Sequence, residues 1–212
     1  KVDQKNNRWL YFTTQFGSHH RVDQLNGTRQ KIEPKPNNGL KYRYTWNTPI
    51  EISPHNPKII YTGGQYLLRS KDRGDSWETI SDDLTSNDSM KIAGKGHIMY
   101  CTITSISESP IKQGLIWVGT DDGKIHLTKN NGRSWFESTN ALVNAGAPKN
   151  YWISRVTTSK HNAAVAFVSI TGFYHDDFKP YVYMSKDYGK SWESISSNLP
   201  QEPVNIVLQD DD

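Results

Sequence analysis

Short runs of alternating side chains, separated by turn-forming residues, recur along the whole chain. Residues 8–16 are one such run, with two interleaved sets: Trp9, Tyr11 and Thr13 against Leu10, Phe12 and Thr14. A period of two places successive side chains on opposite faces, as in a β-strand. Asn26-Gly27 and Asp122-Gly123 separate further runs and are typical of tight hairpin turns. The pattern predicts an all-β protein of short antiparallel strands.

An eight-residue pattern, [Ser/Thr]-Lys-[Asp/Asn]-x-Gly-x-Ser-Trp, occurs three times. The copies begin at Ser70, Thr128 and Ser185, so they are 58 and 57 residues apart. Three copies at a near-constant period indicate a repeat architecture. Four short strands can be read around each copy, with no helix between them, which favours four-stranded antiparallel sheets.

The residue types of the octet suit a hairpin turn that bonds to itself. An Asp or Asn side chain accepts backbone N–H bonds within a tight turn, a glycine adopts a positive φ, and a tryptophan begins the next strand and buries a large ring. We therefore assign a structural role to nine residues: Asp72, Gly74, Trp77, Asn130, Gly132, Trp135, Asp187, Gly189 and Trp192.

This octet resembles the Asp box, or BNR repeat, of sialidases, sortilin-type receptors and related β-propellers. The resemblance implies that each box joins the third and fourth strands of a blade. Further segments resemble large secreted bacterial proteins with sialidase-like or sortilin-like propellers, which are often labelled BNR-repeat glycosyl hydrolases: 46–54, 81–85, 151–155, 175–181 and 199–207. This second resemblance implies a bacterial protein that is secreted or located at the cell surface or in the periplasm.

The repeat divides the chain, taken as one propeller segment over 1–212, into about three and a half blades. The expected parts are a partial blade at 8–33, blades at 45–84, 98–139 and 151–198, and the first strand of a next or closing blade at 203–208. Two architectures fit this count. The chain is part of a larger ring, which we favour because it starts within a blade, or it is a four-bladed ring closed by its last strand.

Composition narrows the class of protein. Hydrophobic residues make up 34%, and aromatic residues make up 11%, which is too aromatic for a disordered chain. The 25 Lys and Arg residues nearly balance the 22 Asp and Glu residues, so nucleic acid is not an expected partner. The sequence has no apolar run of 18 residues, so we expect no membrane-spanning helix.

Cys101 is the single cysteine, which excludes internal disulfides and cysteine-cluster zinc sites. No cofactor or metal site is expected.

Aligning the first strands of the three blades places aromatic residues near one rim. The candidate ligand-binding residues are Trp46, Asn47, His97, Tyr100, Tyr151, Trp152 and Arg155. Flat aromatic faces with amides and a guanidinium suit a carbohydrate or a protein ligand. The alternative is that these aromatic residues pack between blades.

Three carboxylates are candidates for catalysis: Glu51, Asp176 and Asp177. Glu51 lies on a predicted first strand, where a buried carboxylate needs a partner. Asp176 and Asp177 follow His175 in a predicted hairpin, which could be an acid/base pair, a cation site or a solvated loop tip. The arginine triad, Tyr–Glu pair and Arg-Ile-Pro motif of sialidases have no match. The sequence predicts a non-catalytic binding or scaffold module with a carbohydrate or protein ligand, or contacts to a second chain. The alternative is a glycoside hydrolase or part of one.

Overall fold

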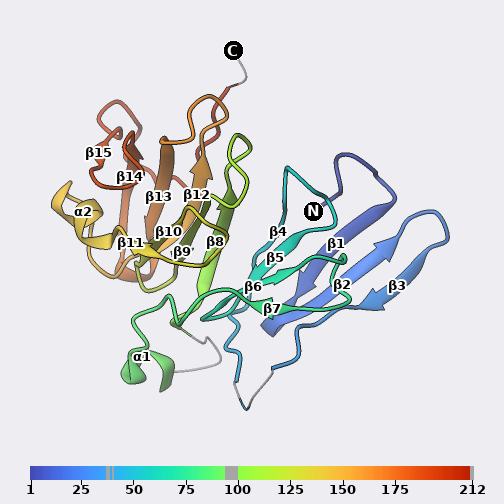
Figure 1. The fold of residues 1–212 in the computed structure, drawn as a ribbon. Helices are drawn as coiled ribbons and strands as arrows, with labels where there is room; N and C mark the ends of the chain where they lie inside the picture. Colours follow the sequence, from blue (N-terminus) through green and yellow to red (C-terminus); the bar gives the residue numbers. More distant parts are fainter. Residues whose placement is uncertain (37–38, 40, 94–99, 211–212) are drawn as a thin grey trace. The chain divides into compact units, whose positions relative to one another are not determined.

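The chain forms two compact units of antiparallel β-sheet, Lys1–Ile103 and Thr104–Asp212. The computed structural model describes residues 1–36, 39, 41–93 and 100–210 (Figure 1). These described residues form three sheets of four strands and one of three, each in simple sequential order. The all-β prediction is confirmed.

The N-terminal unit holds two sheets. One consists of β1 (Trp9–Thr14), β2 (Ser18–Asp23) and β3 (Thr28–Lys31), and a short 3-10 turn, η1 (Gln15–Gly17), joins β1 to β2. The other consists of β4 (Ile50–Ile52), β5 (Ile60–Gly63), β6 (Leu67–Ser70) and β7 (Glu78–Thr79), and the helix α1 (Ser89–Ala93) follows it. Tyr11, Ile32, Ile50 and Ile60 form a buried cluster of this unit.

The C-terminal unit also holds two sheets. The first consists of β8 (Ile103–Glu108), which begins at the boundary between the units, β9 (Ile116–Thr120), β10 (Ile125–Thr128) and β11 (Phe136–Glu137). The second consists of β12 (Trp152–Thr158), β13 (Ala166–Gly172), β14 (Asp177–Ser185) and β15 (Glu193–Ser194). The helix α2 (Thr139–Asn144) lies between β11 and β12, and the 3-10 turn η2 (Phe173–His175) joins β13 to β14.

Each octet forms the same self-bonded turn between the third and fourth strands of its sheet. In the last copy, Gly189 N–H donates to Ser185 Oγ, and the Asp187 carboxylate accepts from Ser191 N and Oγ. The copy at 70–77 repeats these bonds, and in the copy at 128–135 the neutral side chain of Asn130 replaces the carboxylate. Only local contacts are needed, so the sequence alone predicts this turn.

In two of the three octets, the terminal tryptophan ties its sheet to the preceding sheet of the same unit. Trp77 Nε1–H donates to the Ile32 carbonyl just after β3, at 2.8 Å. Trp192 donates to Ser138 Oγ just after β11, and its ring meets that of Trp117 edge to face. A buried cluster joins these two C-terminal sheets, and it includes Trp117, Ile153 and Val168.

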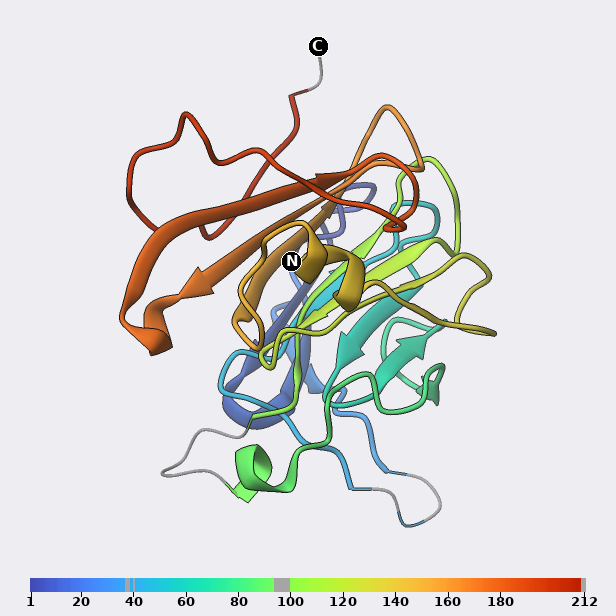
Figure 2. The ribbon, with the colours of Figure 1, turned by 90° about the vertical axis from the view of Figure 1, so that its left-hand side faces the viewer.

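The structure differs from the predicted strands at three places: in the first half of the strand expected at 45–53, at 203–208 and at the start of the chain. Residues 45–49 are not a strand, because Pro49 has no N–H and side-chain hydroxyls bond the carbonyls of Thr48 and Pro49. The expected strand at 203–208 is also absent. Instead, Ser169 Oγ in β13 donates to Asn205 O and Thr157 Oγ1 in β12 donates to Val207 O, so side chains of the β12–β15 sheet hold the segment without a backbone ladder (Figure 2).

The third difference concerns the start of the chain, where no strand was expected before residue 8. Val2 forms an antiparallel bridge with Leu10, and Tyr11 N donates to Lys1 O, so residues 1–3 extend the first sheet. None of the helices formed by the described residues is long and apolar enough to cross a membrane.

Candidate ligand-binding site

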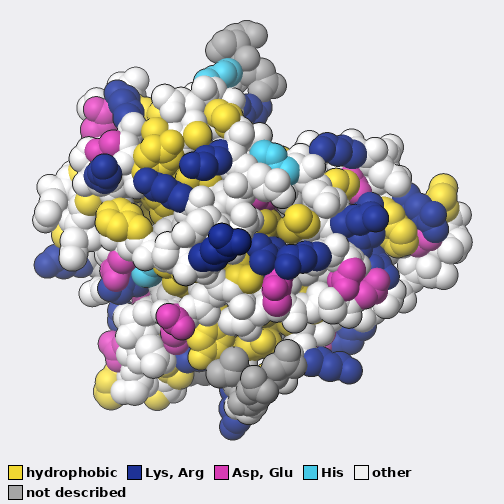
Figure 3. All heavy atoms as spheres, in the orientation of Figure 1, with side chains coloured by type: hydrophobic (Ala, Val, Ile, Leu, Met, Phe, Trp, Pro, Cys, Tyr) yellow, Lys and Arg dark blue, Asp and Glu magenta, His cyan; other side chains and the backbone are white. Residues whose placement is uncertain are grey.

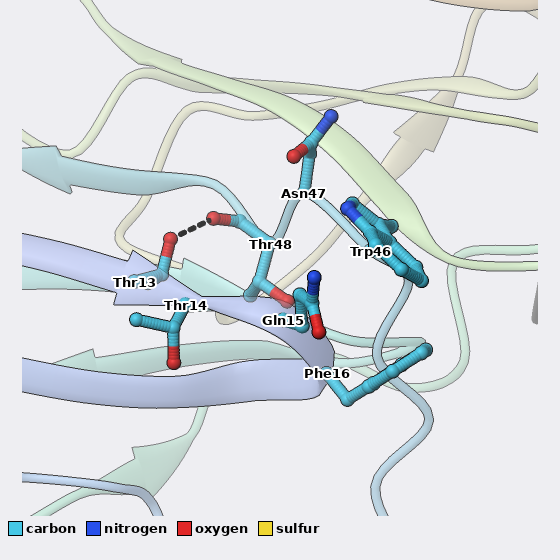
Figure 4. A pocket seen from close by; sticks show the side chains of 7 residues that line it. All are labelled: Thr13, Thr14, Gln15, Phe16, Trp46, Asn47 and Thr48. Carbon is cyan, nitrogen blue, oxygen red and sulfur yellow. Dashed lines mark hydrogen bonds between the residues drawn. The ribbon is translucent and has the colours of Figure 1, made fainter.

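A surface pocket of about 500 Å³ lies in the N-terminal unit, where β1 ends beside the segment that precedes β4. Seven residues line it: Thr13, Thr14, Gln15, Phe16, Trp46, Asn47 and Thr48. Figure 4 shows the rings of Trp46 and Phe16 at one end, the side chains of Thr13 and Thr14 at the other, and Gln15 and Thr48 between them. The pocket contains two of the predicted ligand-binding residues, Trp46 and Asn47.

The turn η1 pushes the Phe16 ring out of the sheet. Phe16 has a φ of 58° and Gly17 a φ of 80°, so two successive residues adopt the left-handed conformation. Gly17 is required here, because a Cβ at this position would lie 2.2 Å from Tyr44 Cδ2. The chain therefore reverses direction between β1 and β2 while 44% of the Phe16 surface stays exposed.

The rings of Phe16 and Trp46 form an edge-to-face pair at the pocket. Their centroids are 5.3 Å apart and their planes meet at 75°. Trp46 is 46% exposed and Phe16 is 44% exposed, so both rings keep surface that a ligand can contact. Two aromatic walls at a steep angle provide apolar faces against which the C–H groups of a ligand can pack.

The remaining lining of the pocket is polar and uncharged. Within the described part of the chain, the amides of Gln15 and Asn47 make no hydrogen bond, so they remain available to a ligand. Thr13 Oγ1 donates to Thr48 O at 2.8 Å and holds the two sides of the pocket together. None of the seven lining residues is acidic or basic, which favours an uncharged, hydroxyl-rich ligand.

A second aromatic surface surrounds η2 in the C-terminal unit. Trp152 stacks on Tyr174 with centroids 5.4 Å apart, and Tyr151 stacks on His175 at 4.2 Å. Phe173, Tyr174 and Phe178 remain about half exposed or more. We call this group the η2 cluster. It joins the predicted rim residues Tyr151 and Trp152 to the predicted 175–177 hairpin, two features that the sequence did not connect.

The Asp177 carboxylate anchors the η2 hairpin. Its Oδ2 accepts from Tyr181 OH at 2.6 Å and from Tyr151 OH at 3.3 Å, and its Oδ1 accepts from Lys179 N. The bond from Tyr181 is the main reason why the pKa of Asp177 lies below its usual value, against the opposing effect of burial. A general acid in glycoside hydrolysis needs a raised pKa, so this environment opposes that role.

The other two candidate carboxylates are placed differently. Glu51 Oε2 forms an ion pair with Lys1 Nζ at 2.8 Å, beside the first sheet of the N-terminal unit. Asp176 is exposed at the end of η2 with a φ of 52°. Neither lines the pocket that holds Trp46.

Three predicted ligand-binding residues remain: Arg155, Tyr100 and His97. Arg155 follows a β-bulge in β12, and its Nε is buried without a hydrogen-bond partner among the described residues. Tyr100 is half-buried in the N-terminal unit, and His97 lies outside the described residues. In the described part of the chain, no group of three His, Cys, Asp or Glu side chains is arranged to hold a metal ion.

Sequence reasoning missed Phe16 and Gln15. The available signal was the Phe16-Gly17 pair at the end of an alternating strand, because a glycine there indicates a turn, where the alternation of side chains between two faces ends. It also missed Phe173, Tyr174 and Phe178, a run of aromatic residues around a predicted loop.

Figure 3 shows acidic and basic side chains on one face of the molecule, with hydrophobic side chains between them.

Comparison with known proteins supports the fold and the repeat. The family model of the BNR-Asp box repeat matches residues 182–195, which include the last octet. Curated proteins give no match.

Solved structures with the same fold are distant in sequence. An auxiliary nutrient binding protein from Bacteroides thetaiotaomicron aligns with a TM-score of 0.57 at 9% identity, over 95% of this chain and 41% of that one. The extracellular domain of the putative hybrid two-component system BT4673 from the same organism aligns with a TM-score of 0.59 at 15% identity, over 93% of this chain and 22% of that one. The Dos1 propeller aligns with a TM-score of 0.57 at 13% identity, over 92% and 48%.

The chain thus spans less than half the length of each of these three structures. The sheets, the three octet turns and these alignments lead to one assignment. The chain has a β-propeller-like fold, and its last octet lies within a match to the BNR-Asp box repeat.

Proposed function

We propose that this chain is a non-catalytic binding module of a bacterial cell-envelope or secreted protein, and that the Trp46 pocket binds an uncharged carbohydrate. The observation that carries the proposal is the pair of half-exposed rings, Trp46 and Phe16, above amides that no described residue engages. Sugar rings present C–H faces for aromatic contact and hydroxyls for amides, so both halves of the pocket have a partner.

Binding without hydrolysis fits the placement of the carboxylates. Glycoside hydrolysis requires two carboxyl groups about 5–10 Å apart on either side of the scissile bond. The pocket lining contributes none, Glu51 is paired with Lys1, and Asp177 is held ionised by Tyr181. These facts support a binding role over the glycoside hydrolase alternative.

The similar structures are consistent with this proposal but do not carry it. The nutrient binding protein and the BT4673 domain come from one bacterium, and the second of them is an extracellular domain. Nutrient binding and an extracellular location are therefore each found among proteins with this fold. Immunogold labelling of the source cells would test the location, and a purely cytoplasmic signal would contradict it.

The test of function is calorimetric titration of the chain with a panel of neutral oligosaccharides. For the sugar that binds, Trp46→Ala should weaken affinity about tenfold, which corresponds to about 1.4 kcal/mol. The matched control is Phe136→Ala on β11, because Phe136 is 47% exposed and Trp46 is 46% exposed. Phe136→Ala should leave the affinity unchanged.

Two outcomes would overturn the proposal. Loss of binding in Tyr174→Ala but not in Trp46→Ala would assign the ligand to the η2 cluster. Release of reducing ends during the titration, abolished by Asp177→Asn or Glu51→Gln, would establish hydrolysis instead.

A further inference from the structure

We propose that His19 and Thr62 are positioning residues that set the spacing between the two aromatic walls of the Trp46 pocket. This inference rests on the proposed function, since it concerns the same pocket. Neither residue lines the pocket, and both side chains are fully buried in the N-terminal unit.

A continuous chain of hydrogen bonds runs from one wall to the other. His19 Nδ1 lies 2.5 Å from Gly17 O, in the turn that presents Phe16. His19 Nε2 lies 2.5 Å from Thr62 Oγ1, which donates to Pro49 O at 2.8 Å. Pro49 is three residues after Trp46. The imidazole and the hydroxyl therefore connect the backbone of the Phe16 turn to the backbone of the segment that presents Trp46.

Counting protons shows why the Thr62 hydroxyl is critical to this bridge. The carbonyls of Gly17 and Pro49 can only accept, so Gly17 O must receive the Nδ1–H of His19. A neutral imidazole then has only an acceptor at Nε2, so Nε2 and Pro49 O compete for the single proton of Thr62, which at any moment is donated to one of them. Burial lowers the pKa of His19 to about 4, so the neutral ring is the form present at pH 7. Without the hydroxyl, both Nε2 and Pro49 O lose their donor.

Packing acts in the same place as the hydrogen bonds. The Tyr44 ring meets the His19 ring edge to face at 5.7 Å, and it fills the space beside the Gly17 backbone. Tyr44 also lies two residues before Trp46. The Phe16 turn is thus held against the Trp46 segment by one aromatic contact and one hydrogen-bonded bridge, which allows little adjustment when a ligand enters.

The test uses the ligand-free protein labelled with 5-fluorotryptophan. The chain has 7 tryptophans, and Trp46→Phe identifies the resonance of Trp46. This resonance senses the Phe16 ring at its edge. Thr62→Val should shift the Trp46 resonance by more than its line width, whereas Thr62→Ser, which keeps the hydroxyl, should restore the wild-type position.

The matched control is Thr45→Val. Thr45 is as buried as Thr62 and is adjacent to Trp46, but its Oγ1 has no hydrogen-bond partner among the described residues. If the bridge matters, removing this nearer hydroxyl should leave the Trp46 resonance in place. An unshifted resonance in Thr62→Val, with native thermal unfolding, would overturn the proposal. So would equal shifts in Thr62→Val and Thr45→Val.

A second variant covers the case in which Thr62→Val does not fold. His19→Asn has a shorter side chain that cannot reach both Gly17 O and Thr62 Oγ1, so it should shift the same resonance, and an unchanged Trp46 signal would contradict the inference. If the panel yields a sugar, Thr62→Val should also weaken its binding severalfold. If no sugar binds, the proposed function fails, but the fluorine spectra still decide the question of positioning.

Discussion

Trp192 and Ser138 form a hydrogen bond between the two sheets of the C-terminal unit, with Trp192 Nε1 2.8 Å from Ser138 Oγ. The same serine hydroxyl donates to Gly189 O, inside the octet turn that Trp192 terminates, at 2.5 Å. One buried hydroxyl therefore satisfies a donor and an acceptor of the next sheet at once.

Removing this hydroxyl should be costly. In Ser138→Ala, the Trp192 N–H and the Gly189 carbonyl lose their shared partner, and we expect a loss of about 1–3 kcal/mol in the free energy of unfolding. Urea unfolding followed by circular dichroism measures it, with exposed Ser197→Ala as the control that should change little. Additive losses in Ser138→Ala and Trp192→Phe would contradict a direct coupling of the two side chains.

The octet at 128–135 offers a gain of stability. Asn130 occupies the place of Asp72 and Asp187, whose carboxylates accept from a serine N–H and hydroxyl four residues later. Bonds to a charged acceptor are stronger, so Asn130→Asp should stabilise the protein by about 0.5–1 kcal/mol at pH 7.

The pH dependence of that gain follows from the existing boxes. Burial alone would raise the pKa of Asp187, but hydrogen bonds from Ser191 and Ser185 outweigh it and lower the pKa. A lowered pKa stabilises the fold above the unfolded value, and this contribution is lost as the pH falls through the folded value. The gain from Asn130→Asp should therefore vanish in acid, and Asp187→Asn should show the mirror-image loss. Denaturation at pH 7 and pH 3 checks both, and a pH-independent difference would contradict them.

The lowered pKa of His19 leads us to expect a loss of stability in mild acid. Burial lowers its folded pKa to about 4, below the unfolded value of 6.5, so the unfolded state binds the proton more readily. Stability should then fall as the pH decreases from about 6.5 towards 4, by about 2 kcal/mol at pH 5.

The control for this effect is His19→Gln, which should remove that part of the pH dependence while leaving the part that comes from the other titratable groups. Denaturant unfolding of both proteins at pH 7 and pH 5 gives the difference. Parallel curves for the two proteins would show that His19 is not the group responsible.

We expect substitution of Asp177 to have a local structural effect rather than a catalytic one. Because its Oδ2 accepts the hydroxyls of Tyr181 and Tyr151, Asp177→Ala should loosen the η2 hairpin. Amide hydrogen exchange of residues 173–178 should accelerate, while that of β10 stays unchanged. Unchanged exchange in the hairpin would mean that the Gly172–Asp177 strand pairing suffices to hold it.

The two aromatic groups show where sequence reasoning reached its limit. Trp46 and Asn47 were predicted as ligand-binding residues, but Phe16 lies 30 positions earlier, and its exposure depends on two successive left-handed residues. Tyr151 and the 175–177 hairpin were considered separately. Tyr151 and this hairpin meet beside Gly172. The pairing of β13 with β14, with its register shift before Gly172, places Asp177 opposite Gly172, and the Tyr151 ring lies against the same glycine.

The absent strands have a related cause. Residues 45–49 and 203–208 have strand-like composition, yet their carbonyls accept bonds from the hydroxyls of Thr13, Thr62, Thr157 and Ser169. Whether a strand-like segment joins a ladder depends on which groups face it, and those groups belong to distant parts of the chain.

The sequence by itself determined the repeat, the all-β fold and the octet turns, because alternation and self-bonded turns involve residues at most a few positions apart. Only the tertiary structure decided that Glu51 pairs with Lys1 and that Asp177 accepts a hydrogen bond from Tyr181. It also decided that Phe16 contacts Trp46 beside uncharged side chains. The Lys1–Glu51 and Phe16–Trp46 contacts join residues 50 and 30 positions apart, and the Asp177–Tyr181 bond, although only four positions long, forms in a hairpin whose register shift no local pattern encodes.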